Sequence, residues 1–411
     1  MFKYISFQIF DRLFTVVFFI LCDSLLARTV SVNEYGYWQY AMNVSLLVYS
    51  FCLLISSEIV VPVLVKNKRI VNEVLTSVII IRLLIFVLCM SVASIYVDFF
   101  NISGLQRELF FSFVFILCVN EIASTSTNYS LAILNVKYTT IANVLSLVIR
   151  AVLYFIAYRS GEGINSFINA RFMEAIIFLT LMLYMLVLFN VKFSFSSYIT
   201  KIIFFRGLKF WFGIFLTYLY TRIDRFFVEH QLNTEVLAYY AVSVQLIEQV
   251  RAFSLILIKS MFSKYIFVKQ SVNNLYSRVN NLIFFVLIFS FVSCFMVWML
   301  SGLFIEIIYS KKYISSVQML DTMSLSVIFI MLDIVFLQFL IRQRMSKFIF
   351  IKALVLSLCA IYIYGFQLDL LGEDYLAYLY NVFNFLALSI SFVFYLLTKR
   401  YYVGRRLPSK K

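Results

Sequence analysis

Charged side chains interrupt the long apolar stretches of this 411-residue sequence. A charge at membrane depth is energetically costly, so each one is a candidate functional residue. The deep bases are Arg82, Arg150, Arg171, Arg222, Arg225 and Arg251. The deep acids are Asp23, Glu58, Glu121, Glu174, Asp224, Glu248 and Asp333. Arginine pairs can hold a phosphate or diphosphate, and carboxyl groups inside membranes relay coupling protons. Together these residues predict ion-coupled export of an anion, with H+ or Na+ as the coupling ion.

The densest group of such charges lies in the stretch LYTRIDRFFVEHQLNTEVLAYYAVSVQLIE, residues 219–248. There Arg222 and Arg225 flank the single carboxylate of Asp224 within an otherwise apolar helix. Two bases beside one acid leave surplus positive charge, which favours an anionic ligand.

A polar stripe is predicted on the fourth apolar segment. Glu121, Ser124, Thr125 and Asn128 follow one another at helical spacing, so they share one face of a helix. Such a face does not point at lipid. It either lines a cavity or joins helices through hydrogen bonds, and the sequence leaves both alternatives open.

Other charges divide into deep and shallow ones. Arg150 lies near mid-depth in its segment and is predicted to point inward. Glu248 and Arg251 are one helical turn apart, and they form either a neutral packing pair or part of the transport pathway. The shallow bases Lys209, Lys259 and Lys352 are interpreted as extending toward the cytoplasmic surface.

Composition places the chain in the membrane. Hydrophobic residues make up 63% of it and charged residues 13%, outside the range of soluble domains. With His230 as the single histidine, and with six cysteines in apolar runs without CxxC spacing, neither a catalytic residue set nor a metal site is predicted. The net charge of +15 is explained by membrane topology and contacts with lipid headgroups, so nucleic-acid binding is not expected.

Hydropathy predicts an all-α polytopic protein with about twelve membrane spans. Their approximate limits are 9–28, 38–60, 75–97, 109–132, 139–158, 167–189, 205–228, 237–260, 281–302, 318–341, 348–367 and 375–398. Proline and glycine are scarce in these spans. That scarcity argues against broken helices and favours rigid lobes that rock against each other.

The chain is predicted to consist of two related halves. An ungapped shift lays Asp224 on Asp23 and Glu235 on Glu34. The predicted organisation is therefore an N-terminal six-helix lobe (1–190), a cytoplasmic connecting loop (191–204), a C-terminal six-helix lobe (205–398) and a basic tail (399–411). A pseudo-twofold axis would relate the two lobes.

Loop charges predict the orientation. Loops on one side carry bases such as Lys66, Lys68 and Arg69, whereas those on the other side carry acids such as Glu34 and Glu162. By the positive-inside rule, both termini are expected in the cytoplasm.

Two segments resemble a known family. They are ARTVSVNEYGYWQYA at 27–41 and RIDRFFVEHQLNTEVLAYYAVSVQLIEQV at 222–250. Both are similar to the paired segments of Wzx-type O-antigen and polysaccharide flippases of the multidrug, oligosaccharidyl-lipid and polysaccharide exporter superfamily. This chain departs from the family pattern with Val30 in place of leucine and Leu237 in place of glycine.

The resemblance implies two six-helix lobes around a cationic cavity, in the cytoplasmic (inner) membrane of a bacterium. It implies an undecaprenyl-diphosphate-linked oligosaccharide as substrate, moved from the cytoplasmic to the periplasmic leaflet by antiport with H+ or Na+. No other cofactor is expected. A polysaccharide polymerase and a chain-length regulator are the implied protein partners.

Two alternatives stay open. A membrane polymerase or glycosyltransferase would use the same lipid-linked sugars, but such enzymes usually need a long outer loop, and the outer loops here are short. A drug exporter of the same superfamily would be expected to have fewer arginines and more uncharged aromatic surface in its cavity.

Overall fold

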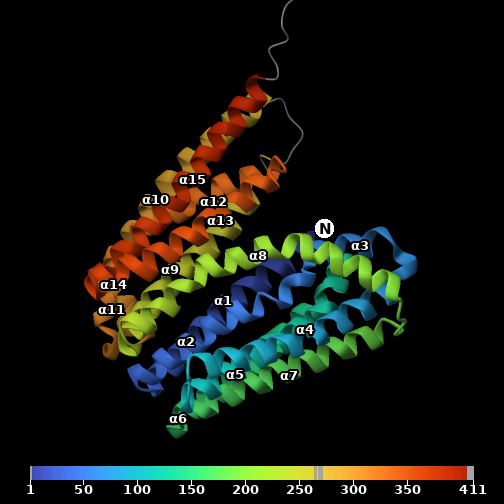
Figure 1. Ribbon diagram of the computed structural model, residues 1–411, viewed down its shortest axis with the longest axis horizontal. Coiled ribbons are helices and arrows are strands. Elements are labelled where there is room, and N and C mark those ends of the chain that lie inside the picture. Colours follow the sequence, from blue (N-terminus) through green and yellow to red (C-terminus); the bar gives the residue numbers. More distant parts are fainter. Residues whose placement is uncertain (1, 263–265, 267–271, 405–411) are drawn as a thin grey trace, which may run out of the picture. The chain divides into compact units, whose positions relative to one another are not determined.

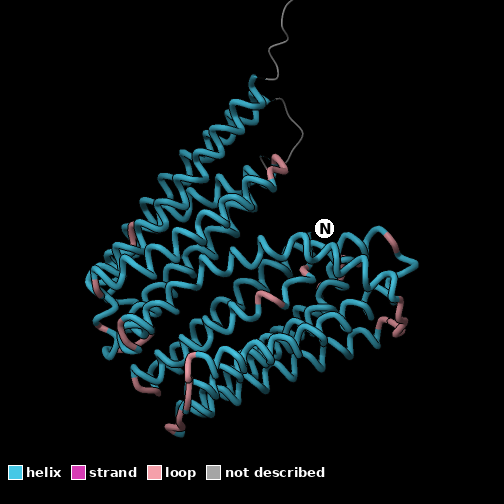
Figure 2. Tube along the Cα trace, viewed as in Figure 1, coloured by secondary structure: helices cyan, strands magenta, loops and turns pink. Residues whose placement is uncertain are grey.

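The computed structural model describes residues 2–262, 266 and 272–404. Within these ranges the chain is helical, with no strand. Figure 2 shows helices joined by short loops. Residues 405–411 of the predicted basic tail lie outside the described residues.

The helices follow the chain in the order labelled in Figure 1. The elements up to the middle of the chain are α1 (Phe2–Thr29), α2 (Val32–Tyr49), η1 (Cys52–Ile55), α3 (Ser57–Lys66), η2 (Lys68–Ile70), α4 (Val71–Phe99), α5 (Gly104–Ala132), α6 (Lys137–Ser160), α7 (Ile164–Leu188) and α8 (Ser197–Gln231). The remaining elements are α9 (Thr234–Met261), α10 (Val272–Ile308), η4 (Lys311–Tyr313), α11 (Ser315–Met323), α12 (Ser326–Arg342), α13 (Ser346–Tyr362), the π-helical turn η5 (Ile363–Gln367), α14 (Leu368–Leu371), η6 (Glu373–Tyr375) and α15 (Leu376–Gly404).

The number of spans agrees approximately with the prediction. Among the described residues, nine helices are long and apolar enough to cross a membrane, and two bent helix pairs raise the count to eleven. The helix α1, of 28 residues, precedes them. The chain is therefore a multi-pass membrane protein, as the composition predicted.

Two spans are broken, contrary to the prediction of unbroken helices. The span made of α2, η1 and α3 bends by 52°, and the span made of α11 and α12 bends by 44°. Neither bend contains proline or glycine. The bends are tolerated because side chains from other helices donate hydrogen bonds to the backbone carbonyls freed there. Trp211 Nε1 donates to Ser50 O at 3.0 Å in the first bend, and Asn381 Nδ2 donates to Thr322 O at 2.7 Å in the second.

The chain divides into two compact units, Met1–Phe226 and Phe227–Lys411. The division falls inside α8, so the first unit holds more of the chain than the predicted lobe 1–190. The other predicted limits, including the connecting loop 191–204, stay predictions.

Helix pairing inside the units supports the predicted repeat. In the first unit, α5 packs on α2, α4 and α7, and α6 packs on α7. In the second unit, α12 packs on α9, α10 and α15, and α13 packs on α15. Counted by span, the fourth member of each half packs on the second, third and sixth, and the fifth packs on the sixth.

Candidate functional site

One charged centre in the first unit joins α4 to α5. Arg82 Nη2 lies 2.5 Å from Glu121 Oε1, and Arg82 Nη1 donates to Thr125 Oγ1 at 2.7 Å. Tyr49 donates its hydroxyl to Glu121 Oε2 at 2.6 Å. The same guanidinium donates to Ile55 O at 3.1 Å, beside the bend of the second span. This centre therefore ties the broken span to α4 and α5.

The polar stripe on α5 is part of that centre. Besides Glu121 and Thr125, it contributes Ser124, whose hydroxyl donates to Glu121 Oε1 at 3.1 Å. Asn128 is buried on the same face. Of the two alternatives for the stripe, this arrangement matches hydrogen bonding between helices.

A second centre joins α6 to α7. Arg150 Nη1 donates to both carboxylate oxygens of Glu174, at 3.0 and 2.9 Å. Arg171 Nη1 also reaches Glu174 Oε2, at 3.4 Å, and its guanidinium lies 5.9 Å from the centre of the Phe113 ring. The Glu174 carboxylate therefore contacts two arginines, Arg150 from α6 and Arg171 from α7.

Asp23 lies beside this second centre. It accepts a hydrogen bond from the Tyr35 hydroxyl at 2.9 Å and one from Gln39 Nε2 at 3.5 Å. A cavity of about 20 Å³ is lined by Asp23, Arg150, Arg171 and Tyr154, among others. That volume is enough for one water molecule, so the carboxylate and the two guanidinium groups border a common water-sized space.

The arginines of α8 take different positions. Arg222 Nη1 donates to Asn43 Oδ1 at 2.9 Å. Arg225 is buried, 3.0 Å from its neighbour Asp224, and donates to Thr221 O at 2.7 Å. Asp224 lies seven residues before the end of α8 at Gln231, and Asp23 lies six before the end of α1 at Thr29. The predicted superposition of the two segments thus agrees with helix boundaries.

In the second unit, Asp333 pairs with a lysine. Lys352 Nζ lies 2.6 and 2.8 Å from the two oxygens of Asp333, and Ser391 donates to the same carboxylate at 2.6 Å. Lys352 is 3% exposed, so its interpretation as a surface-reaching side chain was wrong. The other two predicted residues of this unit, Glu248 and Arg251, lie partly buried on α9.

Several partners of these charges were missed by sequence reasoning. The uncharged partners all lie on α2, and only their position on that helix identifies them as partners of the charges. They are Tyr35, Gln39, Asn43 and Tyr49. Lys352 was missed as a partner because distance from the helix end was its only signal.

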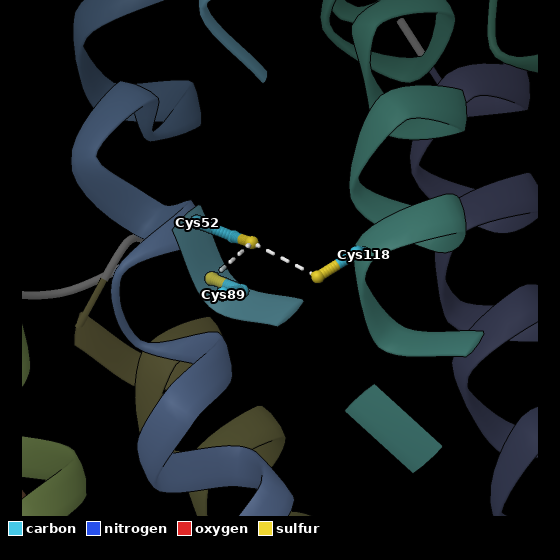
Figure 3. A group of neighbouring side chains, drawn as sticks. All are labelled: Cys52, Cys89 and Cys118. Carbon is cyan, nitrogen blue, oxygen red and sulfur yellow. Dashed lines mark hydrogen bonds between the residues drawn. The ribbon is translucent and has the colours of Figure 1, made fainter. Parts of the chain in front are cut away.

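Three thiols also gather in the first unit. Cys52 Sγ lies 3.6 Å from Cys89 Sγ and 3.5 Å from Cys118 Sγ, and Figure 3 shows the three side chains converging from separate helical segments. Among the described residues they are the set of potential ligand atoms close enough for a metal, within 4.8 Å of one another. Soft ions such as Cu(I) prefer thiolates, but three thiolates would carry more charge into this buried site than such an ion neutralises. Packing of neutral thiols explains the cluster better.

A family model described as "Polysaccharide biosynthesis protein" matches residues 25–318 of the chain. No curated protein matches it in sequence.

The fold is that of known transporters. The lipid II flippase MurJ in an inward closed conformation aligns with a TM-score of 0.73 at 15% identity, over 96% of this chain and 87% of that one. A MATE family multidrug resistance transporter of the MOP superfamily, facing inward, aligns at 0.69 and 14%, over 96% of each chain. A MOP superfamily transporter from Pyrococcus furiosus aligns at 0.61 and 14%, over 96% of this chain and 94% of that one. These neighbours show that the chain has the fold of such transporters, the fold that the sequence analysis expected.

Proposed function

Since the chain belongs to the family of polysaccharide biosynthesis proteins, we propose that it is a flippase for a lipid-linked repeat unit of a surface polysaccharide. The substrate is an undecaprenyl-diphosphate-linked O-antigen unit or a related one. The protein moves it from the cytoplasmic to the periplasmic leaflet of a bacterial inner membrane, with both of its termini in the cytoplasm. A polymerase and a chain-length regulator act on the exported units as partners.

The observation that carries this proposal is the presence of interior arginines in a transporter fold. They fall into two classes. Arg82, Arg150 and Arg225 are 2–3% exposed and lie against Glu121, Glu174 and Asp224. The arginines of the second class are partly exposed: Arg171 and Arg222 in the first unit, and Arg251 in the second. We assign the second class to contacts with the diphosphate and the first class to helix positioning.

Replacing Arg222 tests this assignment. Arg222→Ala is expected to reduce export about tenfold or more, because a charged hydrogen bond of this kind contributes about 1.5–3 kcal/mol. Arg206→Ala is the matched control, since Arg206 lies exposed on the same helix. Export is measured as surface glycan per unit of protein in the membrane. Equal export by the two variants would contradict a substrate contact at Arg222.

Ion coupling is proposed at Asp23, because this carboxylate borders the water-sized cavity beside Arg150 and Arg171. A water there can exchange a proton with it, which favours H+ as the coupling ion. Asp23→Asn is expected to stop the movement of the lipid-linked substrate across the bilayer that an imposed pH gradient drives in proteoliposomes. The variant is expected to fold normally. A response to a sodium gradient alone in the unaltered protein would refute proton coupling.

The experiment that tests the whole proposal is the glycan profile of a strain lacking this gene. A flippase predicts that single lipid-linked units accumulate on the cytoplasmic side and that the surface lacks the polymer. Lipopolysaccharide carrying one unit without a chain would mean that units still cross, and the protein would be a polymerase. An unchanged glycan with increased drug sensitivity would identify a drug exporter.

A further inference from the structure

The second unit contains a polar cavity that the transport proposal does not use. Its volume is about 760 Å³, within the range of about 300–1,000 Å³ typical of small-ligand sites. It lies where the start of α9, the helix α11 and the turn η6 with the start of α15 come together. The lining residues that matter are Glu235, Glu373, Asp374, Tyr239, Tyr375 and Tyr378.

The charge of this cavity has one sign. Glu235, Glu373 and Asp374 are exposed along its wall, and its lining includes no lysine, arginine or histidine. The carboxylates are nevertheless spread out: among the described residues, no set of three acids brings its oxygens within 4.8 Å of one another. A chelated cation therefore fits the wall less well than a ligand with several separate hydrogen-bond donors.

Aromatic surface accompanies the acids. The rings of Tyr375 and Tyr378 are half exposed, at 50% and 57%, with centroids 6.2 Å apart and planes inclined by 48°. Tyr239 donates its hydroxyl to Glu235 Oε1 at 2.7 Å, which fixes that carboxylate. Such rings offer an apolar face bearing partial negative charge to the C–H face of a sugar ring.

Amide groups complete the wall. Asn233 uses its Oδ1 to accept the N–H of Val236 at 2.7 Å, so its NH2 group is the part that serves as a donor. Gln318 is exposed on α11. Together these groups suit a carbohydrate. The carboxylates accept hydrogen bonds from sugar hydroxyls, the amides donate to sugar hydroxyls, and the aromatic rings pack on sugar C–H groups.

A cavity of similar size in the first unit is different. It has about 750 Å³ and lies at the starts of α5 and α7, the fourth and sixth spans of that half. Its wall carries Arg107 together with Glu108, and Arg107 lies 5.9 Å from the Phe111 ring centre. This wall therefore carries both signs of charge, unlike the acidic wall in the second unit.

We propose that the acidic cavity of the second unit binds the glycan part of the exported unit and selects neutral or amino sugars over uronic acids. This inference rests on the proposed flippase function. By the loop charges, the cavity faces the periplasm, so it would hold the sugars on the side to which they are delivered. A carboxylate-bearing sugar would be repelled by Glu235, Glu373 and Asp374.

The test uses full-length protein in lipid nanodiscs and the free repeat-unit oligosaccharide. Mild acid releases this probe from the lipid-linked intermediate that accumulates in the strain lacking the gene. Saturation-transfer NMR is expected to show transfer from the protein to the sugar C–H protons. Tyr378→Ala and Tyr375→Ala should each weaken binding about tenfold.

Tyr362→Ala is the matched control, because Tyr362 has the same exposed fraction as Tyr378, 57%, in the same unit but outside the cavity. Its binding is expected to equal that of the unaltered protein. The double change Glu373→Gln with Asp374→Asn should weaken binding of the probe and improve binding of digalacturonate.

Three results would overturn the inference. The first is that both Tyr375→Ala and Tyr378→Ala bind the sugar as well as the unaltered protein does. The second is that Tyr362→Ala weakens sugar binding as much as those two variants do. The third is that the protein binds calcium but shows no saturation transfer to the sugar. The flippase proposal fails separately, when the deletion strain accumulates no lipid-linked unit to release.

Discussion

At the scale of single residues, deep opposite charges pair across the turns that join consecutive helices. Arg82 lies 17 residues before the end of α4 at Phe99, and Glu121 lies 17 residues after the start of α5 at Gly104. Opposite charges at equal distances from a tight turn reach the same depth in a helical hairpin.

The same rule applies to the second centre of the first unit. Arg150 and Glu174 are each ten residues from the ends of α6 and α7 that face their connecting turn, at Ser160 and Ile164. These pairings were therefore predictable once helix ends were known. The neutral partners were not, because Tyr49 and Gln39 depend on how α2 is rotated about its axis.

Removing one member of a deep pair should be worse than removing both. Glu121→Leu leaves Arg82 buried without its carboxylate, a loss of about 3–5 kcal/mol, whereas the double variant Arg82→Met with Glu121→Leu should regain most of it. Thermal unfolding in detergent and the amount of protein in the membrane measure both. A double variant no more stable than the single one would contradict a packing role for the pair.

The thiol cluster makes a second residue-scale prediction. Cys52→Ala is expected to destabilise the protein by about 1–2 kcal/mol through lost packing. Cys359→Ala is the control, because Cys359 is a partly exposed free cysteine outside the cluster. Purified protein carrying equimolar metal that is lost in Cys52→Ala would instead establish the cluster as a metal site.

At the scale of elements, the broken second span is the main departure from expectation. The sequence around Ser50 contains neither proline nor glycine, so composition alone favours a continuous helix. The break forms because donors from other helices, Trp211 and Arg82, reach its carbonyls. Such long-range satisfaction of backbone groups is invisible in local sequence.

Gly207 on α8 leaves room for this break, because it has no side chain where α8 packs against η1. A Cβ built there would collide with the carbonyl oxygen of Leu54, inside η1. Gly207→Ala is therefore expected to destabilise the protein by about 1–3 kcal/mol. Gly302 provides the control within α10, since its Cβ would meet nothing within 4 Å, and Gly302→Ala should be neutral or slightly stabilising. Equal thermal stability of the two variants would contradict close packing of α8 on η1.

At the scale of the whole molecule, the class of fold and the approximate number of spans were predictable, because hydropathy and loop charge extend over the entire chain. The contacts of α8 were not. Its residues as far as Phe226 pack with the first compact unit, whereas the predicted loop at 191–204 stays a prediction. Which unit a helix joins depends on tertiary contacts such as that between Trp211 and Ser50.

The orientation of the molecule is open to a direct measurement. Alkaline phosphatase, which is active only in the periplasm, should be active when fused after Gly163 or Gly372, in the turns that precede α7 and η6. Green fluorescent protein fused after the C-terminus should fluoresce, since that end is expected in the cytoplasm. The reverse pattern would invert the proposed direction of transport.

Three ion pairs among the described residues share one further property. Each joins helices that follow one another in the chain: α4 with α5, α6 with α7, and α12 with α13. During synthesis, each hairpin can therefore leave the translocon with its charges already matched. The ribosome need not finish a later span before Arg82, Arg150 or Lys352 enters lipid, so biogenesis of each unit can proceed hairpin by hairpin.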